Sequence, residues 1–84
     1  MKTIIELFKI ADVYGIMLSI VRQTGGFDIR LDTIDGEATI TIEGGRIFAF
    51  VIKSVNMDDV IAFTQYYQNI IPLFTDNDDI ELDN

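Results

Sequence analysis

Hydrophobic residues recur every three or four positions through the first quarter of the chain. Between Lys2 and Gln23, this spacing includes Ile4, Leu7, Phe8, Ala11, Tyr14, Leu18 and Val21. It predicts one amphipathic helix over residues 2–23, closed by the glycines of "TGG" (24–26). Gly15 is a weak point of that helix, since glycine costs about 1 kcal/mol relative to alanine inside a helix. An alternative interpretation ends the helix near Asp12 and makes "YGIMLSIVR" (14–22) a strand.

The middle of the chain changes to strict alternation. "FDIRLDTI" (27–34) and "EATITIE" (37–43) place apolar residues at every second position, which is typical of strands with one face buried. "DG" (35–36) and "GG" (44–45) are typical of tight hairpin turns, and "RIFAFVIK" (46–53) completes a third strand. We therefore expect an antiparallel meander, a topology that commonly leaves one face in water.

The third strand is apolar on both faces. Ile47, Ala49 and Val51 should point one way, and Phe48, Phe50 and Ile52 the other. Either the helices or the C-terminal segment cover both faces from within, or Phe48 and Phe50 form an exposed apolar patch. In the second case, acidic side chains would rim the patch, as in a surface for a partner or a second copy. These are Asp28, Asp32, Glu37 and Glu43.

A second helix should follow the strands. Ser54 or Asn56 is suited to the N-cap, and Asn56 would place Asp58 and Asp59 in the first turn, where the helix dipole favours them. Val55 and Val60 are spaced as a hydrophobic staple. We expect the regular pattern to end at Pro72. The acidic segment 76–84 is then either a solvated tail or a short strand through Ile80 and Leu82.

The predicted fold class is therefore α+β: a helix, a three-stranded antiparallel β-meander and a helix in one domain (1–75), followed by an acidic C-terminal tail (76–84). The 84 residues are sufficient for one small domain. The N-terminal segment is apolar but interrupted by charges, so we expect neither a signal peptide nor a membrane span, and a cytoplasmic location.

Charge is distributed unevenly along the chain. The net charge is −8, yet residues 1–24 hold three basic and two acidic residues, a balance of +1. Residues 25–84 hold three basic and twelve acidic residues, a balance of −9. Such a surface repels nucleic acid and anionic membranes and attracts basic proteins, or serves solubility alone. We expect no direct binding to nucleic acid or membranes.

The amino-acid composition argues against catalysis and metal binding. Histidine and cysteine are absent, which removes the usual general base and the soft metal ligands. The segment "DNDDIELD" (76–83) resembles a calcium loop, but Glu81 stands where an EF-hand requires glycine. The glycines match no phosphate-binding pattern. We predict a non-enzymatic protein with no catalytic, cofactor-binding or metal-binding residues.

The stretch "TGGFDIRLDTIDGEATITIEGGRIFAF", residues 24–50, resembles the PatA N-terminal type of bacterial domain. That family has a helical run, a "TG" that opens a strand, and a G-x-I-x-F-x-x-G-R-I hairpin followed by a helix. Thr24–Gly25 and residues 36–47 have compatible spacing, whereas the family's later Ala and Gly are matched only by Ala49. The resemblance covers 27 of 84 residues and implies a protein-interaction module.

A second resemblance is one of kind. A short, acidic, histidine-free α+β chain is similar to small phage-encoded inhibitors, including anti-CRISPR proteins and DNA mimics. This resemblance implies docking on a basic, nucleic-acid-handling protein. The partner-binding residues predicted for this role, together with the apolar patch, are Asp28, Asp32, Asp35, Glu37, Glu43, Phe48, Phe50, Asp76, Asp78, Asp79 and Glu81. The alternative is a signalling or dimerisation module that uses Phe48 and Phe50, and a homodimer is left open.

Overall fold

Four strands form the sheet, one more than the sequence pattern predicted. The computed structural model describes the backbone of residues 2–82 and the side chains of residues 3–74. The elements are α1 (Lys2–Val13), β1 (Met17–Gln23), β2 (Gly26–Asp32), β3 (Gly36–Glu43), β4 (Arg46–Ser54) and α2 (Met57–Leu82). The prediction of an α+β fold with an antiparallel meander is confirmed, and the strand count is corrected.

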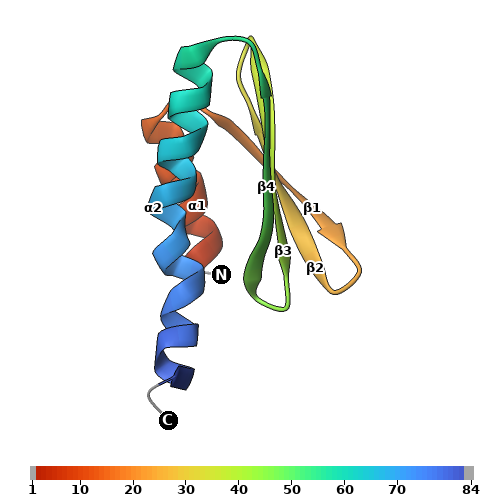
Figure 1. Ribbon diagram of the computed structural model, residues 1–84, viewed down its shortest axis with the longest axis vertical. Helices are drawn as coiled ribbons and strands as arrows, with labels where there is room; N and C mark the ends of the chain where they lie inside the picture. Colours follow the sequence, from red (N-terminus) through yellow and green to blue (C-terminus); the bar gives the residue numbers. More distant parts are fainter. Residues whose placement is uncertain (1, 83–84) are drawn as a thin grey trace.

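The sheet has the order β1-β2-β3-β4, and every neighbouring pair is antiparallel. Both helices lie on the same face of the sheet (Figure 1). The core therefore forms a single layer between sheet and helices, and the alternation predicted for β2 and β3 holds. The buried hydrophobic residues are Leu7, Ala11, Ile16, Ile29, Leu31, Ala38, Ile40, Ile42, Phe63, Tyr66, Ile70 and Phe74.

The first helix ends at Val13, so the prediction of one helix over residues 2–23 is wrong. The alternative of a shorter helix followed by a strand is confirmed, although the strand begins at Met17 and not at Tyr14. Gly15 has a φ of +67° and supplies the left-handed C′ residue. The amide of Ile16 donates to the carbonyl of Ala11 at 3.0 Å, and that of Gly15 donates to Asp12 at 3.1 Å. These are the two hydrogen bonds of a Schellman motif. Ile16 and Ala11 are both buried, which supplies the motif's hydrophobic contact.

The glycine-rich turns differ from their predicted roles in two of three cases. "TGG" does not close a helix; it turns the chain from β1 into β2, and Gly25 has a φ of +81°. The Gly44–Gly45 turn is confirmed, and both residues have positive φ. Gly36, in contrast, is the first residue of β3 and has no positive φ, so the predicted type I′ turn at residues 35–36 is wrong. A side chain at Gly36 would overlap Ser54, which explains the glycine by close approach.

A β-bulge in β4 accounts for its two apolar faces. Thr41 pairs with Ala49, but the next residue, Ile42, pairs with Ile47, and Phe48 is left as the extra residue. The register shift turns Ile47, Phe50 and Ile52 towards the helices, where all three pack against the core. The predicted division of this strand into odd and even faces is therefore wrong for the residues before Ala49: Ile47 lies on the same face as Phe50 and Ile52, and Phe48 does not.

The start of α2 follows the prediction, and its later course does not. The Asn56 Oδ1 atom accepts a hydrogen bond from the amide of Asp58 at 2.9 Å, which confirms Asn56 as the N-cap. Val55 is fully exposed, so the predicted staple with Val60 does not form. The helix continues through Pro72, because the stripe that buries Ile70 also buries Phe74 one turn later. Its backbone reaches Leu82, and the side chains of the acidic segment lie outside the described residues.

Candidate protein-binding surface

Three segments that are separate in sequence meet at one end of the molecule, which we call the acidic pole. The end of α1, the start of β1, the β2–β3 turn, the end of β4 and the start of α2 all lie there (Figure 1). Six carboxylates come from these segments: Asp12, Asp32, Asp35, Glu37, Asp58 and Asp59. Residues 12–17, 32–37 and 53–59 contain a single basic residue, Lys53, which pairs with Glu37 across β3 and β4.

The same end also exposes large apolar side chains. Five of them project here, and Ile34 and Val55 are fully exposed. The five are Val13, Met17, Ile34, Val55 and Met57. Single exposed apolar residues are ordinary, but a group of them rimmed by charge is typical of interaction surfaces. The acidic pole therefore combines a negative field with apolar contact area.

A hollow of about 510 Å³ lies at the centre of the acidic pole. Its walls come from the α1–β1 connection, the β2–β3 turn and the first turns of α2. They are Tyr14, Gly15, Met17, Asp32, Thr33, Ile34, Asp35, Asp59 and Ala62. Apolar and acidic groups thus line one concave site, and such a site suits a group that is itself both apolar and cationic.

Hydrogen bonds fix the segments that form the hollow. The Thr33 hydroxyl donates to the Asp59 carboxylate at 2.7 Å and so ties the β2–β3 turn to α2. The Asn56 side-chain amide donates to the Asp35 carboxylate at 3.1 Å, a second link between the same two segments. The turn itself is closed by the Thr33 amide, which donates to the Gly36 carbonyl at 2.9 Å. Asp35 and Asp59 therefore help to shape the site as well as to charge it.

The predicted acidic partner-binding residues do not form one surface. Asp32, Asp35 and Glu37 lie at the acidic pole. Glu43 is exposed at the opposite end of the sheet, next to the Gly44–Gly45 turn. Asp28 is half-buried and accepts a hydrogen bond from the Gln23 side chain at 3.1 Å. The side chains of Asp76, Asp78, Asp79 and Glu81 lie outside the described residues.

The predicted apolar patch of Phe48 and Phe50 does not exist as one surface. Phe48 is 70% exposed at the bulge, whereas Phe50 lies on the helix-facing side. Phe50 stacks on Tyr67 of α2, with ring centroids 4.3 Å apart and planes 3° from parallel. The two aromatic side chains are separated by the register shift, so the rim of acids around them is lost as well.

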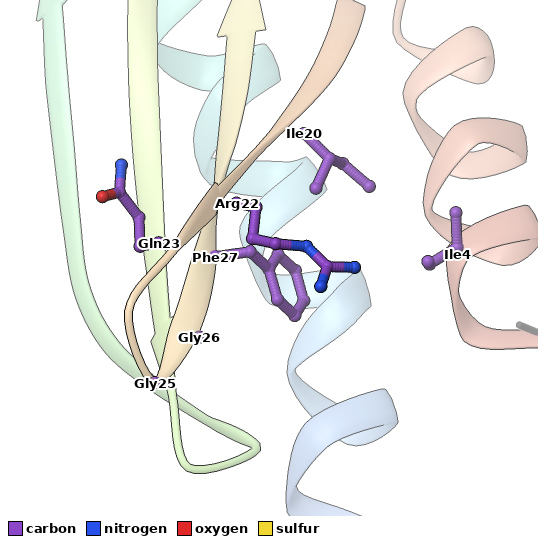
Figure 2. A pocket seen from close by; sticks show the side chains of 7 residues that line it. All are labelled: Ile4, Ile20, Arg22, Gln23, Gly25, Gly26 and Phe27. Carbon is purple, nitrogen blue, oxygen red and sulfur yellow. The ribbon is translucent and has the colours of Figure 1, made fainter.

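A second hollow, of about 490 Å³, lies between α1 and the β1–β2 hairpin (Figure 2). Ile4 projects from α1 towards Ile20 of β1, and the Arg22 side chain extends over the Phe27 ring. Among the described residues, the Arg22 side chain has no hydrogen bond or ion pair. This groove is apolar with one cation, in contrast to the acidic pole.

A metal centre and a membrane-spanning helix are both absent from the part of the chain that the structure describes. It contains no group of three or more acidic side chains placed to hold a metal ion. It also contains no helix that is long and apolar enough to span a membrane. Comparison with protein-family models, curated proteins and solved structures finds no match to this chain. The comparisons therefore neither support nor refute the two resemblances.

Sequence reasoning missed half of the carboxylates of the acidic pole and all of its exposed apolar side chains. Asp12, Asp58 and Asp59 were not among the predicted binding residues, nor were any of its five apolar side chains. A signal was present, because Ile34 and Val55 are large apolar residues inside a turn and a capping segment. Such segments normally lie at the surface, so an apolar residue there is exposed unless a partner covers it.

Proposed function

We propose that this protein is a non-enzymatic binding module whose acidic pole docks on a cationic, partly apolar segment of a basic protein. The observation that carries the proposal is the gathering of six carboxylates and five exposed apolar side chains at one end of the molecule, where three of the carboxylates and two of the apolar side chains line a hollow. A basic partner would be attracted over a distance by the charge and held at contact by the apolar groups.

The apolar content favours a mixed segment over a pure phosphate-binding groove as the docking site. A mimic of nucleic acid needs regularly placed negative charge and gains nothing from exposed Ile34 or Val55. An amphipathic basic helix or loop presents both kinds of group at once. Proteins that handle nucleic acid carry many such segments, and inhibition of one of them by a phage-encoded protein is a setting that this chemistry would serve.

The test uses two peptides as probes: an amphipathic helix of leucine and lysine, and an oligolysine of equal charge. We expect tighter binding of the amphipathic peptide, measured by titration calorimetry on the full chain. Salt should weaken its binding only in part, because the apolar contacts are not screened. Equal binding of both peptides would contradict the role of the apolar groups.

Matched variants locate the site. Asp32→Lys at the acidic pole should weaken binding of the amphipathic peptide several-fold, and Glu43→Lys at the far end of the sheet should not. Both residues are exposed and both changes alter the net charge equally. Ile34→Asp and Phe48→Asp form a second pair of exposed apolar residues, of which only Ile34→Asp should weaken binding. Equal effects within the first pair would mean that binding depends on net charge alone. Equal effects within the second pair would mean that it depends on non-specific apolar contacts.

A further inference from the structure

The two edge strands of the sheet are protected unequally. β4 contains the bulge and Lys53, and α2 packs along it through the Phe50–Tyr67 stack. β1 pairs with β2 in continuous register over its seven residues, and Arg22 is its one charged side chain. An even edge with little charge can accept another strand, because one row of its backbone groups faces outward. β1 therefore lacks the bulge and the aromatic stack that distinguish β4.

Exposed apolar groups on α1 lie next to this edge. Ile4 lines the groove between α1 and β1, and Phe8 is four residues later on the same helix face. Phe8 is 46% exposed and Ile5 56% exposed. Ile4 and Ile20 face each other across this groove (Figure 2), and Ile5 and Phe8 extend the exposed apolar surface along α1. A partner at the β1 edge would cover this surface in the same step.

Charge identifies the partner that this surface fits. Residues 1–24, which contain α1 and β1, have a balance of +1, whereas the remainder of the chain has −9. Two copies of the protein repel one another over most of their surfaces, and the repulsion is weakest where α1 and β1 face each other. The same segment carries the unprotected edge and the exposed apolar helix face.

We propose that the partner at this edge is a second copy, and that β1 pairs with β1 in antiparallel fashion about a two-fold axis at Ser19. A two-fold interface must be complementary to itself, and antiparallel strands oppose residues of the same face. The axis at Ser19 places Leu18 opposite the partner's Ile20 on the helix side and Met17 opposite the partner's Val21 on the open side. An axis at Ile20 would place Leu18 opposite the partner's Arg22, an apolar group against a charge.

The oligomeric state of the full chain tests the proposal directly. We expect a dimer in analytical ultracentrifugation, Phe8→Glu to be monomeric, and Phe48→Glu to remain dimeric. Phe48 is the matched control, since it is the more exposed phenylalanine and lies on the other edge strand. Circular dichroism should show native secondary structure for both variants. A monomeric wild-type chain, or a dimer that only Phe48→Glu dissociates, would overturn the proposal.

Crosslinking tests the axis and does not depend on Phe8. The chain has no cysteine, so one introduced thiol gives an unambiguous product. Ser19→Cys lies on the proposed axis and should form a disulfide-linked dimer under mild oxidation. Val51→Cys is the control and should form no such dimer. Val51 lies in the same row of the sheet as Ser19, through the pairs Ser19–Arg30, Arg30–Thr39 and Thr39–Val51. Crosslinking at Val51 in preference to Ser19 would exclude this interface. Met17 belongs both to the acidic pole and to the proposed interface. None of these variants changes Met17, so peptide binding at the acidic pole can be measured separately for each of them.

Discussion

The two helices cover the same face of the sheet but contribute to the core in different ways. α2 buries Phe63, Tyr66, Ile70 and Phe74 in one continuous stripe. α1 buries only Leu7 and Ala11 to the same degree and leaves Ile5, Phe8 and Val13 exposed. The α2 side of the molecule therefore supplies most of the buried aromatic area, while α1 leaves more of its apolar side chains in contact with solvent. The core therefore depends more on α2 than on α1.

Phenylalanine-to-alanine substitutions in the two helices test this difference most strongly. Phe63→Ala should lower the free energy of unfolding by about 3–5 kcal/mol, because Phe63 is fully buried and a cavity would remain. Phe8→Ala should lower it by about 1 kcal/mol or less, because Phe8 is nearly half exposed. Urea denaturation at low protein concentration measures both. Equal losses would mean that α1 is as much part of the core as α2.

Gly15 gives the next largest expected effect and the sharpest test of where α1 ends. Gly15→Ala should destabilise the protein by about 1–2 kcal/mol, because alanine is unfavourable at a φ of +67°. Apart from Gly15 and its two chain neighbours, no residue has an atom within 4 Å of an added Cβ, so this cost is one of backbone conformation alone. Thermal unfolding measures it, and Gly15→Asn, which tolerates the left-handed region better, should cost less. A continuous helix over residues 2–23 requires the opposite sign, since alanine would then stabilise it.

The sequence predicted the parts of the fold that local rules determine. The alternation of β2 and β3, the Gly44–Gly45 turn and the Asn56 cap each depend on a few neighbouring residues. The end of α1 was ambiguous because residues 14–22 fit both a helical stripe and an edge strand. In the folded chain, the Gly15 Schellman motif and the pairing of β1 with β2 decide between them.

Features that depend on distant contacts could not be predicted in this way. The bulge at Phe48 follows from a register shift against β3, and nothing within β4 itself marks it. The course of α2 through Pro72 depends on the burial of Phe74 against the rest of the core. The acidic pole gathers three segments that are separate in sequence, so only the folded arrangement brings Ile34, Val55 and Asp58 to one end.

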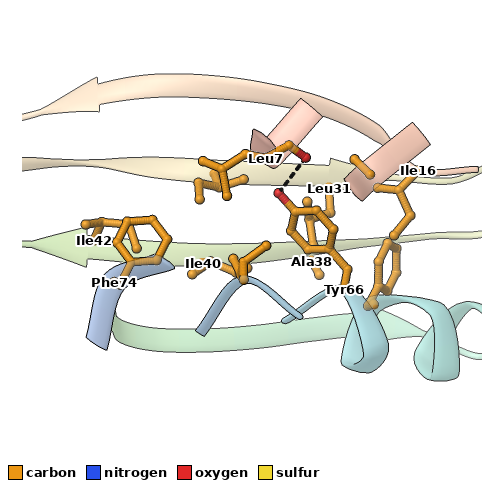
Figure 3. Packing of buried hydrophobic residues seen from close by; sticks show 12 residues of the cluster. Leu7, Ile16, Leu31, Ala38, Ile40, Ile42, Tyr66 and Phe74 are labelled. Atoms are coloured by element: carbon orange, nitrogen blue, oxygen red, sulfur yellow. Dashed lines mark hydrogen bonds between the residues drawn. The ribbon is translucent and has the colours of Figure 1, made fainter. Parts of the chain in front are cut away.

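Tyr66 links the two helices and provides a prediction that depends on pH. Its hydroxyl donates a hydrogen bond to the Leu7 carbonyl of α1 at 3.3 Å (Figure 3). Burial of the side chain raises the pKa of Tyr66 above its ordinary value of about 10. Because the folded-state pKa is the higher one, this contribution to stability is complete below pH 10 and is lost as the pH rises further.

Tyr66→Phe should therefore cost about 1 kcal/mol at neutral pH, the value of one lost hydrogen bond. Above pH 10, the variant should lose stability less steeply than the wild type, since it has no phenol there to ionise. Urea denaturation at neutral pH and at several alkaline values measures both effects. Tyr67→Phe is the control, because Tyr67 is only half-buried; an identical change of slope in that variant would remove Tyr66 from the explanation.

The smallest expected effect on stability comes from the Phe50–Tyr67 stack, which joins β4 to α2. A double-mutant cycle of Phe50→Leu and Tyr67→Leu should give a coupling energy of about 0.5–1 kcal/mol, because offset aromatic pairs contribute this much beyond their buried area.

The stack gives the β4 edge a covering contact, whereas the groove beside β1 leaves that edge open. The double variant should therefore remain folded but begin to associate through β4, so that Val51→Cys in this background forms crosslinks that it does not form in the wild type. Unchanged crosslinking would mean that the bulge and Lys53 alone are enough to protect that edge.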